Sequence, residues 1–415
     1  MSSALRPSPA DTEAAPAAAR WRMLALLASA ELLGMSLWFT ASASADHFRE
    51  LWSLSPGQVS GLTTAVQLGF VAGTAAAALL NLADVLPARW LFSVSALGAS
   101  ACNLGLLGAT SFHVALALRF ATGLLLAGVY PPAMKMTATW FRAGRGMAIG
   151  TVVGALTVGK AAPYLVHALF GSVHPHFVIG STSAGGVVAG ALVLALYRDG
   201  PHAFPPRQFA WSLVARVARH RETRLAIGGY LGHMWELYAC WTLVALFFHD
   251  LFLARGLPGS AAAARAGVAA FAVIATGGLG SVLAGRWADR LGRERITIWA
   301  MAVSGACSLT IGWLLAAPTA LVLPLALLWG FAVVADSAQF SAVVTEVAPP
   351  DAVGTALTLQ TSLGFLLTAF SIWLAASVSA RFGWGIAFSI LAVGPVLGIR
   401  AMLQLRRARS RPTAR

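Results

Sequence analysis

The chain is a series of apolar runs of about 20 residues, each followed by a short polar break. Wound as a helix that rises about 1.5 Å per residue, such a run crosses a hydrocarbon core of roughly 30 Å. The pattern therefore predicts an all-α membrane protein with twelve transmembrane helices. We expect the spans near residues 22–45, 57–82, 90–110, 113–133, 146–169, 176–197, 225–248, 266–286, 296–316, 320–345, 353–378 and 383–404.

The longest interior polar stretch divides these spans into two groups of six. We expect six-helix bundles at 21–197 and 225–404, a cytoplasmic linker at 198–224, a disordered Ala/Pro-rich tail at 1–20 and a basic tail at 405–415. In the linker, apolar residues alternate with arginines: Phe209, Trp211, Leu213, Val214 and Val217 with Arg207, Arg216, Arg219 and Arg221. This predicts an amphipathic helix on the cytoplasmic membrane surface, with an irregular basic linker as the alternative.

Composition agrees with a lipid environment, because 58% of the residues are hydrophobic and only 11% are charged. The formal charge of +14 could indicate a nucleic-acid partner, but the basic residues lie in loops and tails, which excludes that class. With the N-terminus inside, only four of the 29 lysine and arginine residues fall outside: Arg49, Arg255, Arg265 and Arg381. The asymmetry places both termini in the cytoplasm. The excess of arginine over lysine is typical of a GC-rich bacterial genome, so we expect the bacterial inner membrane.

The two halves of the chain repeat each other. A shift of 205 residues places Glu31 on Glu236, Asp84 on Asp289 and Cys102 on Cys307. Since each half has six spans, both copies have the same orientation in the membrane, which is typical of parallel-repeat transporters.

One polar break carries an unusual density of charge, at residues 285–295. The pattern Gly285-x-x-x-Asp289-Arg290-x-Gly292-Arg293-x-Arg295 resembles the signature loop of the major facilitator superfamily (MFS). The first half has a degenerate copy that keeps Asp84 and Arg89. Arg119-x-x-x-Gly123 resembles that superfamily's second motif, whereas its antiporter motif in the fifth span is not clearly present.

The resemblance implies two bundles related by a pseudo-twofold axis and alternating access around a central cavity lined by the first, fourth, seventh and tenth helices. The loop would act as a gate, because Asp289 can accept from the N-terminal amides of a neighbouring helix while its arginines bind acids and lipid phosphate. A purely topogenic loop is the alternative.

Charged side chains inside the spans are costly and are therefore functional or paired. They are the candidates for substrate binding and proton coupling: Glu31, Arg119, Lys160, Glu236 and Asp336. Helix rise places Glu31 roughly 13 Å and Arg119 roughly 18–20 Å from the cytoplasmic edge, so a salt bridge between them is possible. Glu236 has no obvious partner near it in sequence, and Asp336 lies toward the cytoplasmic mouth of the cavity. Structural pairing that fixes helix packing is the alternative.

Aromatic and amide side chains near these charges are expected to shape the pocket. They are Trp38, His233, Trp235, Tyr238, Trp241, Gln339 and Gln360. Lys160 and Arg119 can hold an anion, and a buried carboxylate can exchange a proton because a low dielectric favours its neutral form.

The sequence thus predicts a monomeric secondary transporter that moves a small organic or inorganic anion together with protons. Proton-driven efflux of a hydrophobic or cationic compound is the alternative, and a transport-dead receptor or assembly factor on the same fold is another. We expect no cofactor and no metal, because the three cysteines show neither CxxC nor CxxH spacing. An embedded enzyme is disfavoured, since no nucleophile–base pair or HExxH motif is present.

Overall fold

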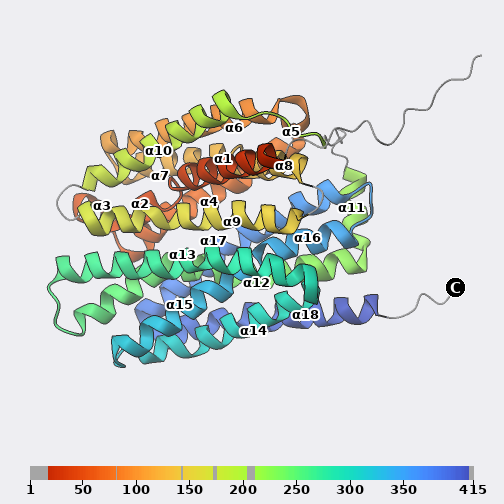
Figure 1. The fold of residues 1–415 in the computed structure, drawn as a ribbon. Coiled ribbons are helices and arrows are strands. Elements are labelled where there is room, and N and C mark those ends of the chain that lie inside the picture. The colour runs from red at the N-terminus through yellow and green to blue at the C-terminus, as the bar shows by residue number, and fades with distance from the viewer. Residues whose placement is uncertain (1–16, 81, 142–143, 172–174, 203–210, 411–415) are drawn as a thin grey trace, which may run out of the picture.

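The computed structural model describes residues 17–80, 82–141, 144–171, 175–202 and 211–410. These ranges are almost entirely helical and contain no β-strand. Figure 1 shows the helices running side by side in two groups, α1–α10 above and α12–α18 below. Residues 1–16 of the predicted N-terminal tail lie outside the described residues, as does the end of the C-terminal tail, whereas residues 17–20 are helical rather than disordered and begin α1 (Ala17–Met35).

Six membrane crossings form the first bundle, and several combine two helices. They are α1 (Ala17–Met35) with α2 (Thr40–Ala43), α4 (Pro56–Leu79), α6 (Ala88–Leu104) with η1 (Gly105–Gly108), α7 (Phe112–Leu126) with α8 (Tyr130–Trp140), α9 (Arg145–Val166) with η2 (His167–Gly171), and α10 (Pro175–Leu196). The short connections α3 (Ala45–Trp52) and α5 (Leu82–Val85) lie at opposite ends of the bundle (Figure 1).

The second bundle repeats this plan. Its crossings are α12 (Arg221–Leu253), α13 (Gly259–Leu291), α14 (Arg293–Ile311) with η3 (Gly312–Leu314), α15 (Thr319–Ala335) with α16 (Ser337–Val347), and α17 (Val353–Ser389) followed by η4 (Ile390–Ala392) and α18 (Val393–Arg409). The chain turns back inside α17 at Gly383, whose φ of 81° is readily available only to glycine. Residues 384–409 therefore make the twelfth crossing.

Ten helical stretches of the described chain are long and apolar enough to span a membrane. The last of them, Val353–Arg409, contains two crossings because of the turn at Gly383. The remaining crossing is α1, which carries Arg20, Arg22 and Glu31. The predicted fold of twelve helices in two bundles is confirmed.

The first predicted span is not one continuous helix. Residues 22–45 were expected to be helical throughout, but α1 ends at Met35 and residues 36–39 form turns before α2 begins. The fourth crossing of each bundle is also interrupted, between α7 and α8 and at Asp336 between α15 and α16. Hydropathy does not reveal these breaks, because the apolar run continues across each of them.

The largest contacts between the bundles are those of α9 with α13 and of α4 with α17, and α9 also touches α16. Small residues let α9 and α13 approach closely: a Cβ atom added at Gly154 would lie 2.9 Å from the carbonyl oxygen of Gly278. A Cβ atom at Gly150 would lie 3.1 Å from the carbonyl oxygen of Ser281. The backbones of the two bundles are therefore close together where α9 meets α13.

The linker contains the short helix α11 (Trp211–Arg219). We expected its apolar face to lie on the membrane surface, but α11 packs on α12 and α17, and Val217 is completely buried. Arg216 forms an ion pair with Asp351, in the loop just before α17. Phe209 and Arg207 lie outside the described residues.

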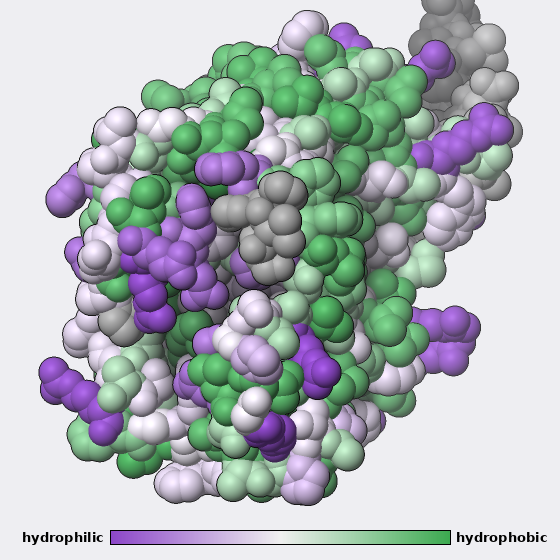
Figure 2. All heavy atoms as spheres, turned by 90° about the vertical axis from the view of Figure 1, so that its left-hand side faces the viewer, coloured by the Kyte–Doolittle hydropathy of each residue, from purple (hydrophilic) through white to green (hydrophobic). Residues whose placement is uncertain are grey.

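Large apolar side chains remain exposed along the flanks of the bundles, as a lipid-facing surface requires. Figure 2 views the end of the molecule that holds α3 and the connection between α12 and α13, and hydrophilic side chains are interspersed among apolar ones there. The charged network described below lies at the opposite end, near the end of α18 (Figure 1).

Candidate functional site

A small pocket lies between the two bundles, with a volume of about 60 Å³. That space holds only a few water molecules, so the pocket is contracted in this conformation. Its walls come from α1, α4, α8 and α9 of the first bundle and from α12, α15, α16 and α17 of the second. Any ligand here would therefore touch both bundles.

Lys160 of α9 is the central charged side chain of the pocket. Its ammonium nitrogen lies 3.8 Å from the ring centroid of Trp38 and 4.7 Å from that of Tyr238. Trp241 and Phe365 follow at 5.6 Å and 5.9 Å. These are cation–π distances, and Lys160 also donates a hydrogen bond to the Tyr238 hydroxyl. We call the four rings of Trp38, Tyr238, Trp241 and Phe365 the aromatic cage.

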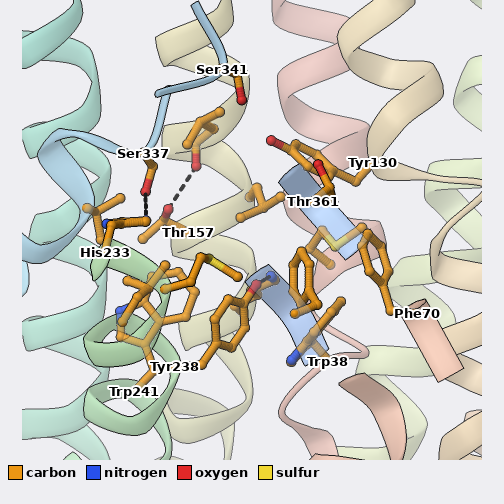
Figure 3. A pocket seen from close by; sticks show the side chains of 18 of the residues that line it. Trp38, Phe70, Tyr130, Thr157, His233, Tyr238, Trp241, Ser337, Ser341 and Thr361 are labelled. Carbon is orange, nitrogen blue, oxygen red and sulfur yellow. Dashed lines mark hydrogen bonds between the residues drawn. The ribbon is translucent and has the colours of Figure 1, made fainter. Parts of the chain in front are cut away.

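The cage is assembled from both bundles. Lys160 and Trp38 belong to the first bundle, whereas Tyr238 and Trp241 on α12 and Phe365 on α17 belong to the second. Figure 3 shows Trp38, Tyr238 and Trp241 at one end of the pocket and Tyr130 and Ser341 at the other. A movement of the bundles must therefore change the surroundings of the ammonium group.

Glu31 lies close enough to Lys160 and Tyr130 to interact with both electrostatically, although it does not line the pocket. The side chain is completely buried on α1, and neither carboxylate oxygen has a hydrogen-bond partner among the described residues. A buried carboxylate without partners is costly when ionised. Glu31 is thus a candidate for protonation coupled to the charge state of the pocket.

Arg119 and Glu31 do not form the salt bridge that helix rise made possible. Its guanidinium donates to the carbonyl oxygen of Leu37 at 3.0 Å, to that of Trp38, and to Asn103 Oδ1 at 2.9 Å. The break after Met35 leaves these two carbonyls outside the helical hydrogen-bond pattern, so the buried arginine satisfies them. Arg119 therefore holds the interrupted segment that carries Trp38 into the pocket.

Glu236 lies inside the second bundle rather than in the pocket. No partner was apparent near it in sequence, and its carboxylate accepts hydrogen bonds from Ser304 Oγ at 2.8 Å and Trp329 Nε1 at 2.7 Å. These donors come from α14 and α15 and are far from Glu236 in sequence. The side chain thus ties three helices of one bundle together.

Asp336 is buried instead of lying at the cavity mouth. Its Oδ1 atom is 2.8 Å from Nδ1 of His233, although the two groups are not aligned for a hydrogen bond. The other ring nitrogen of His233 lies 2.9 Å from Ser337 Oγ, a contact that Figure 3 also shows. His233 and Ser337 line the pocket. Asp336 contacts His233 but does not line the pocket itself, and it lies at the break between α15 and α16.

The other predicted pocket residues lie outside the pocket wall. Trp235 donates to the carbonyl oxygen of Ile390 at 3.1 Å, and Gln339 accepts from Arg293. Gln360 is buried beside Ser341, with 3.4 Å between Nε2 and Oγ. Within the described residues, no group of three or more His, Cys, Asp or Glu side chains is placed to hold a metal ion.

Several lining residues were missed from the sequence: Phe70, Tyr130, Thr157, Tyr230, Ser337, Ser341, Thr361 and Phe365. Phe365 could have been found, because the shift of 205 residues that aligns Glu31 with Glu236 also aligns Lys160 with Phe365. For the others, the rotation of an apolar helix cannot be determined from its sequence.

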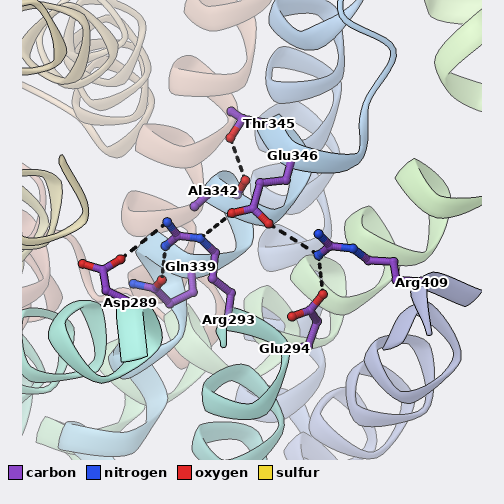
Figure 4. Close-up of polar contacts among 8 residues, drawn as sticks. All are labelled: Asp289, Arg293, Glu294, Gln339, Ala342, Thr345, Glu346 and Arg409. Carbon is purple, nitrogen blue, oxygen red and sulfur yellow. Dashed lines mark hydrogen bonds and ion pairs between the residues drawn. The ribbon is translucent and has the colours of Figure 1, made fainter. Parts of the chain in front are cut away.

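The charged loop at 285–295 forms a polar network at the end of the second bundle (Figure 4). Arg293 donates to Glu346 Oε1 at 2.7 Å and to Gln339 Oε1 at 2.8 Å, and lies 3.6 Å from Asp289 Oδ1. Arg409 adds an ion pair with Glu294 and one of 3.4 Å with Glu346. The network thereby connects α13, α14, α16 and α18. Arg290 and Arg295 are exposed.

Asp289 also faces the first bundle. Its Oδ1 atom would lie 3.1 Å from a Cβ atom added at Gly146, in the first turn of α9. Gly285, one turn earlier on α13, lies against the carbonyl of the same glycine. A carboxylate beside a helix N-terminus is favoured by the helix dipole. In the degenerate copy, Arg89 is exposed, and the side chain of Asp84 lies outside the described residues.

The family model of the Major Facilitator Superfamily matches residues 25–254 of the chain, which is more than half of its length. The match includes the degenerate loop at Asp84 and ends before the intact copy at 285–295. Among curated proteins, no sequence is similar enough to match the chain.

Solved transporter structures share the fold. The human organic anion transporter MFSD10 is 16% identical, with a TM-score of 0.70 over 93% of this chain and 100% of that chain. The proton:xylose symporter XylE gives a TM-score of 0.70 at 15% identity over 93% and 95% of the two chains. The nucleoside transporter NupG gives 0.68 at 15% identity over 93% and 99%. At these identities the likeness establishes the fold alone.

Replacing Arg119 with Gln should destabilise the protein strongly. The change leaves the buried carbonyls of Leu37 and Trp38 without their donor, at about 1–3 kcal/mol for each unsatisfied group. We expect a lower thermal unfolding midpoint in detergent, together with altered fluorescence from Trp38. Arg22→Gln, an exposed arginine of α1, is the matched control. Equal midpoints for the two variants would contradict this role.

Replacing Asp289 with Asn should loosen the contact between α13 and the N-terminus of α9, whereas Asp84→Asn should have a smaller effect. A cysteine introduced at Gly146 reports this contact through its rate of thiol labelling. In the Asp289→Asn background we expect that rate to rise roughly 2- to 10-fold, because the helix-end charge contributes about 0.3–1 kcal/mol and packing is also lost. Equal labelling rates in the Asp289→Asn and Asp84→Asn backgrounds would show that the intact loop holds the bundles together no more than the degenerate one does.

Proposed function

Because the chain belongs to the Major Facilitator Superfamily, we propose that it transports a small anion by alternating access, with Lys160 as the group that binds the anionic end of the substrate. The family identifies a multi-pass membrane transporter rather than an enzyme. The observation that carries the anion assignment is the charge of the pocket. Its lining contains Lys160 and His233 but no carboxylate.

Lys160 is suited to receive an anion because no carboxylate is in salt-bridge contact with it among the described residues. Ring faces and one phenol hydroxyl stabilise the ammonium group in this conformation. An anion that enters the pocket would form a charge-assisted hydrogen bond, which is stronger than the bond to the neutral Tyr238 hydroxyl. A cationic substrate would instead be repelled by Lys160, so the pocket supports the alternative of cation efflux less well.

Anion binding would also loosen the contact between the bundles. The ammonium group comes from the first bundle, whereas three of the four cage rings come from the second. A substrate that draws Lys160 toward itself weakens these cation–π contacts. Binding energy is thereby used to favour movement, which is what alternating access requires.

Proton coupling follows from the position of Glu31. Charged Lys160 and charged Glu31 attract each other, and a bound anion weakens that attraction. Anion binding therefore favours proton uptake by Glu31, so that the two move together. The basic loops support a bacterial inner-membrane location with both termini in the cytoplasm. Residues of one copy line both sides of the pocket, which supports a monomer.

Proteoliposomes containing a pH-sensitive dye test this function. We expect lactate, phosphate or benzoate to drive internal pH changes beyond those of protein-free liposomes. Lys160→Met should abolish this signal, since the anion loses its charged partner. Glu31→Gln should retain flux of the labelled anion while losing proton movement.

Tetramethylammonium chloride is the control for the opposite charge, and Arg22→Gln is the control for a distant arginine. A proton signal with tetramethylammonium and with none of the three anions would overturn the anion assignment. So would an unchanged anion response in Lys160→Met.

A further inference from the structure

The wall around Lys160 is built almost entirely from aromatic rings that contact one another. Ring centroids lie 5.2 Å apart for Trp38 and Phe70, 4.6 Å for Phe70 and Phe365, and 5.1 Å for Tyr238 and Phe365. Trp38 and Phe365 are 5.6 Å apart. In this contracted pocket the rings cover each other's faces and edges. When the pocket opens to admit a substrate, these faces become the surface that the substrate meets.

We infer that the substrate is a small monoanion with a flat aromatic body, such as an aromatic carboxylate. The anionic group would bind Lys160 and the Tyr238 hydroxyl, and the ring would insert among Trp38, Phe70 and Phe365. This inference rests on the proposed function, because it extends the anion site around Lys160. It specifies the body of the substrate, whereas the anion site specifies only the charged group.

An aromatic body fits this wall better than a saturated one of the same size. Aromatic pairs gain more than the burial of their area, through the electrostatics of ring faces and edges, and the gain corresponds to a few-fold up to about tenfold in affinity. Separating the cage rings also removes the ring–ring contacts between them. A substrate ring can replace these with new ring–ring contacts of its own. A saturated ring restores the buried area but not these contacts.

The far end of the pocket limits the length of the substrate. Hydroxyl-bearing residues gather there, namely Thr157, Ser337, Ser341 and Thr361. Figure 3 shows them across the pocket from Trp38, Tyr238 and Trp241. An extended alkyl chain would have to cover these polar groups, which is unfavourable. A single ring attached directly to the anionic group avoids this cost.

The test measures apparent dissociation constants from the dose-dependent thermal stabilisation of the purified full chain. The probes are benzoate, cyclohexanecarboxylate as a saturated acid of matched size and charge, benzamide as the uncharged ring, and tetramethylammonium. We expect benzoate to bind roughly 3- to 10-fold more tightly than cyclohexanecarboxylate. Benzamide should bind at least about tenfold more weakly than benzoate, because it lacks the charge-assisted bond to Lys160.

Two variants separate charge from ring recognition. Lys160→Met should weaken benzoate binding about tenfold or more and bring it to the level of benzamide. Phe365→Leu should lower the ratio of benzoate to cyclohexanecarboxylate affinity toward one, since Leu keeps the apolar volume but removes a ring face. The comparison of ligands on the unaltered chain stands even if a variant fails to fold.

The outcomes distinguish this inference from the proposed function. Equal affinities for the two acids, both dependent on Lys160, would overturn the aromatic body and leave the anion site intact. Stabilisation by tetramethylammonium and by neither acid would overturn both. Benzoate binding that is unchanged in Lys160→Met would also overturn both, because the ring would then be bound without its anionic partner.

Discussion

A single ammonium group in the membrane interior constrains the rest of this structure. A charge at that depth is costly unless something stabilises it. Here the described structure places four aromatic rings around Lys160, one of them the phenol of Tyr238, rather than a contacting carboxylate. Since the rings come from both bundles, the two halves of the protein must stay together for the charge to be sheltered. The group that would bind the substrate is thus also part of the contact that the substrate must loosen.

The second requirement is interrupted backbone beside the pocket. Trp38 reaches Lys160 because the first crossing breaks after Met35, and broken helices are tolerated inside membranes only where other groups satisfy the freed carbonyls. Arg119 supplies these donors from α7. The fourth crossings break just before Tyr130 and Ser337, and both residues line the pocket. Close approach of glycines between α9 and α13 then brings the halves together on the side where Asp289 faces the start of α9.

The architecture could be predicted from the sequence, but the partners of individual charges could not. Apolar runs and the distribution of arginines gave twelve crossings in two bundles, and Lys160, Trp38, His233, Tyr238 and Trp241 do share one pocket. The salt bridge that helix rise allowed between Glu31 and Arg119 does not form, because the guanidinium donates to the Leu37 and Trp38 carbonyls that the break after Met35 frees. Glu236 showed no partner near it in sequence, and its donors Ser304 and Trp329 come from other helices. An apolar helix does not show which way its polar residue points, and long-range partners such as these cannot be identified from hydropathy.

The most direct test of the account uses the fact that the chain has only two lysines, Lys135 and Lys160. Lysine labelled at the ε-carbon gives two signals in an NMR spectrum of the protein in nanodiscs, and Lys160→Arg assigns them. If Lys160 lies against the faces of Trp38 and Tyr238, ring currents shift its ε-methylene protons strongly upfield of those of Lys135, and Trp38→Leu reduces the shift. Two lysine signals at ordinary positions, unchanged by Trp38→Leu, would contradict the aromatic cage and the anion site built on it.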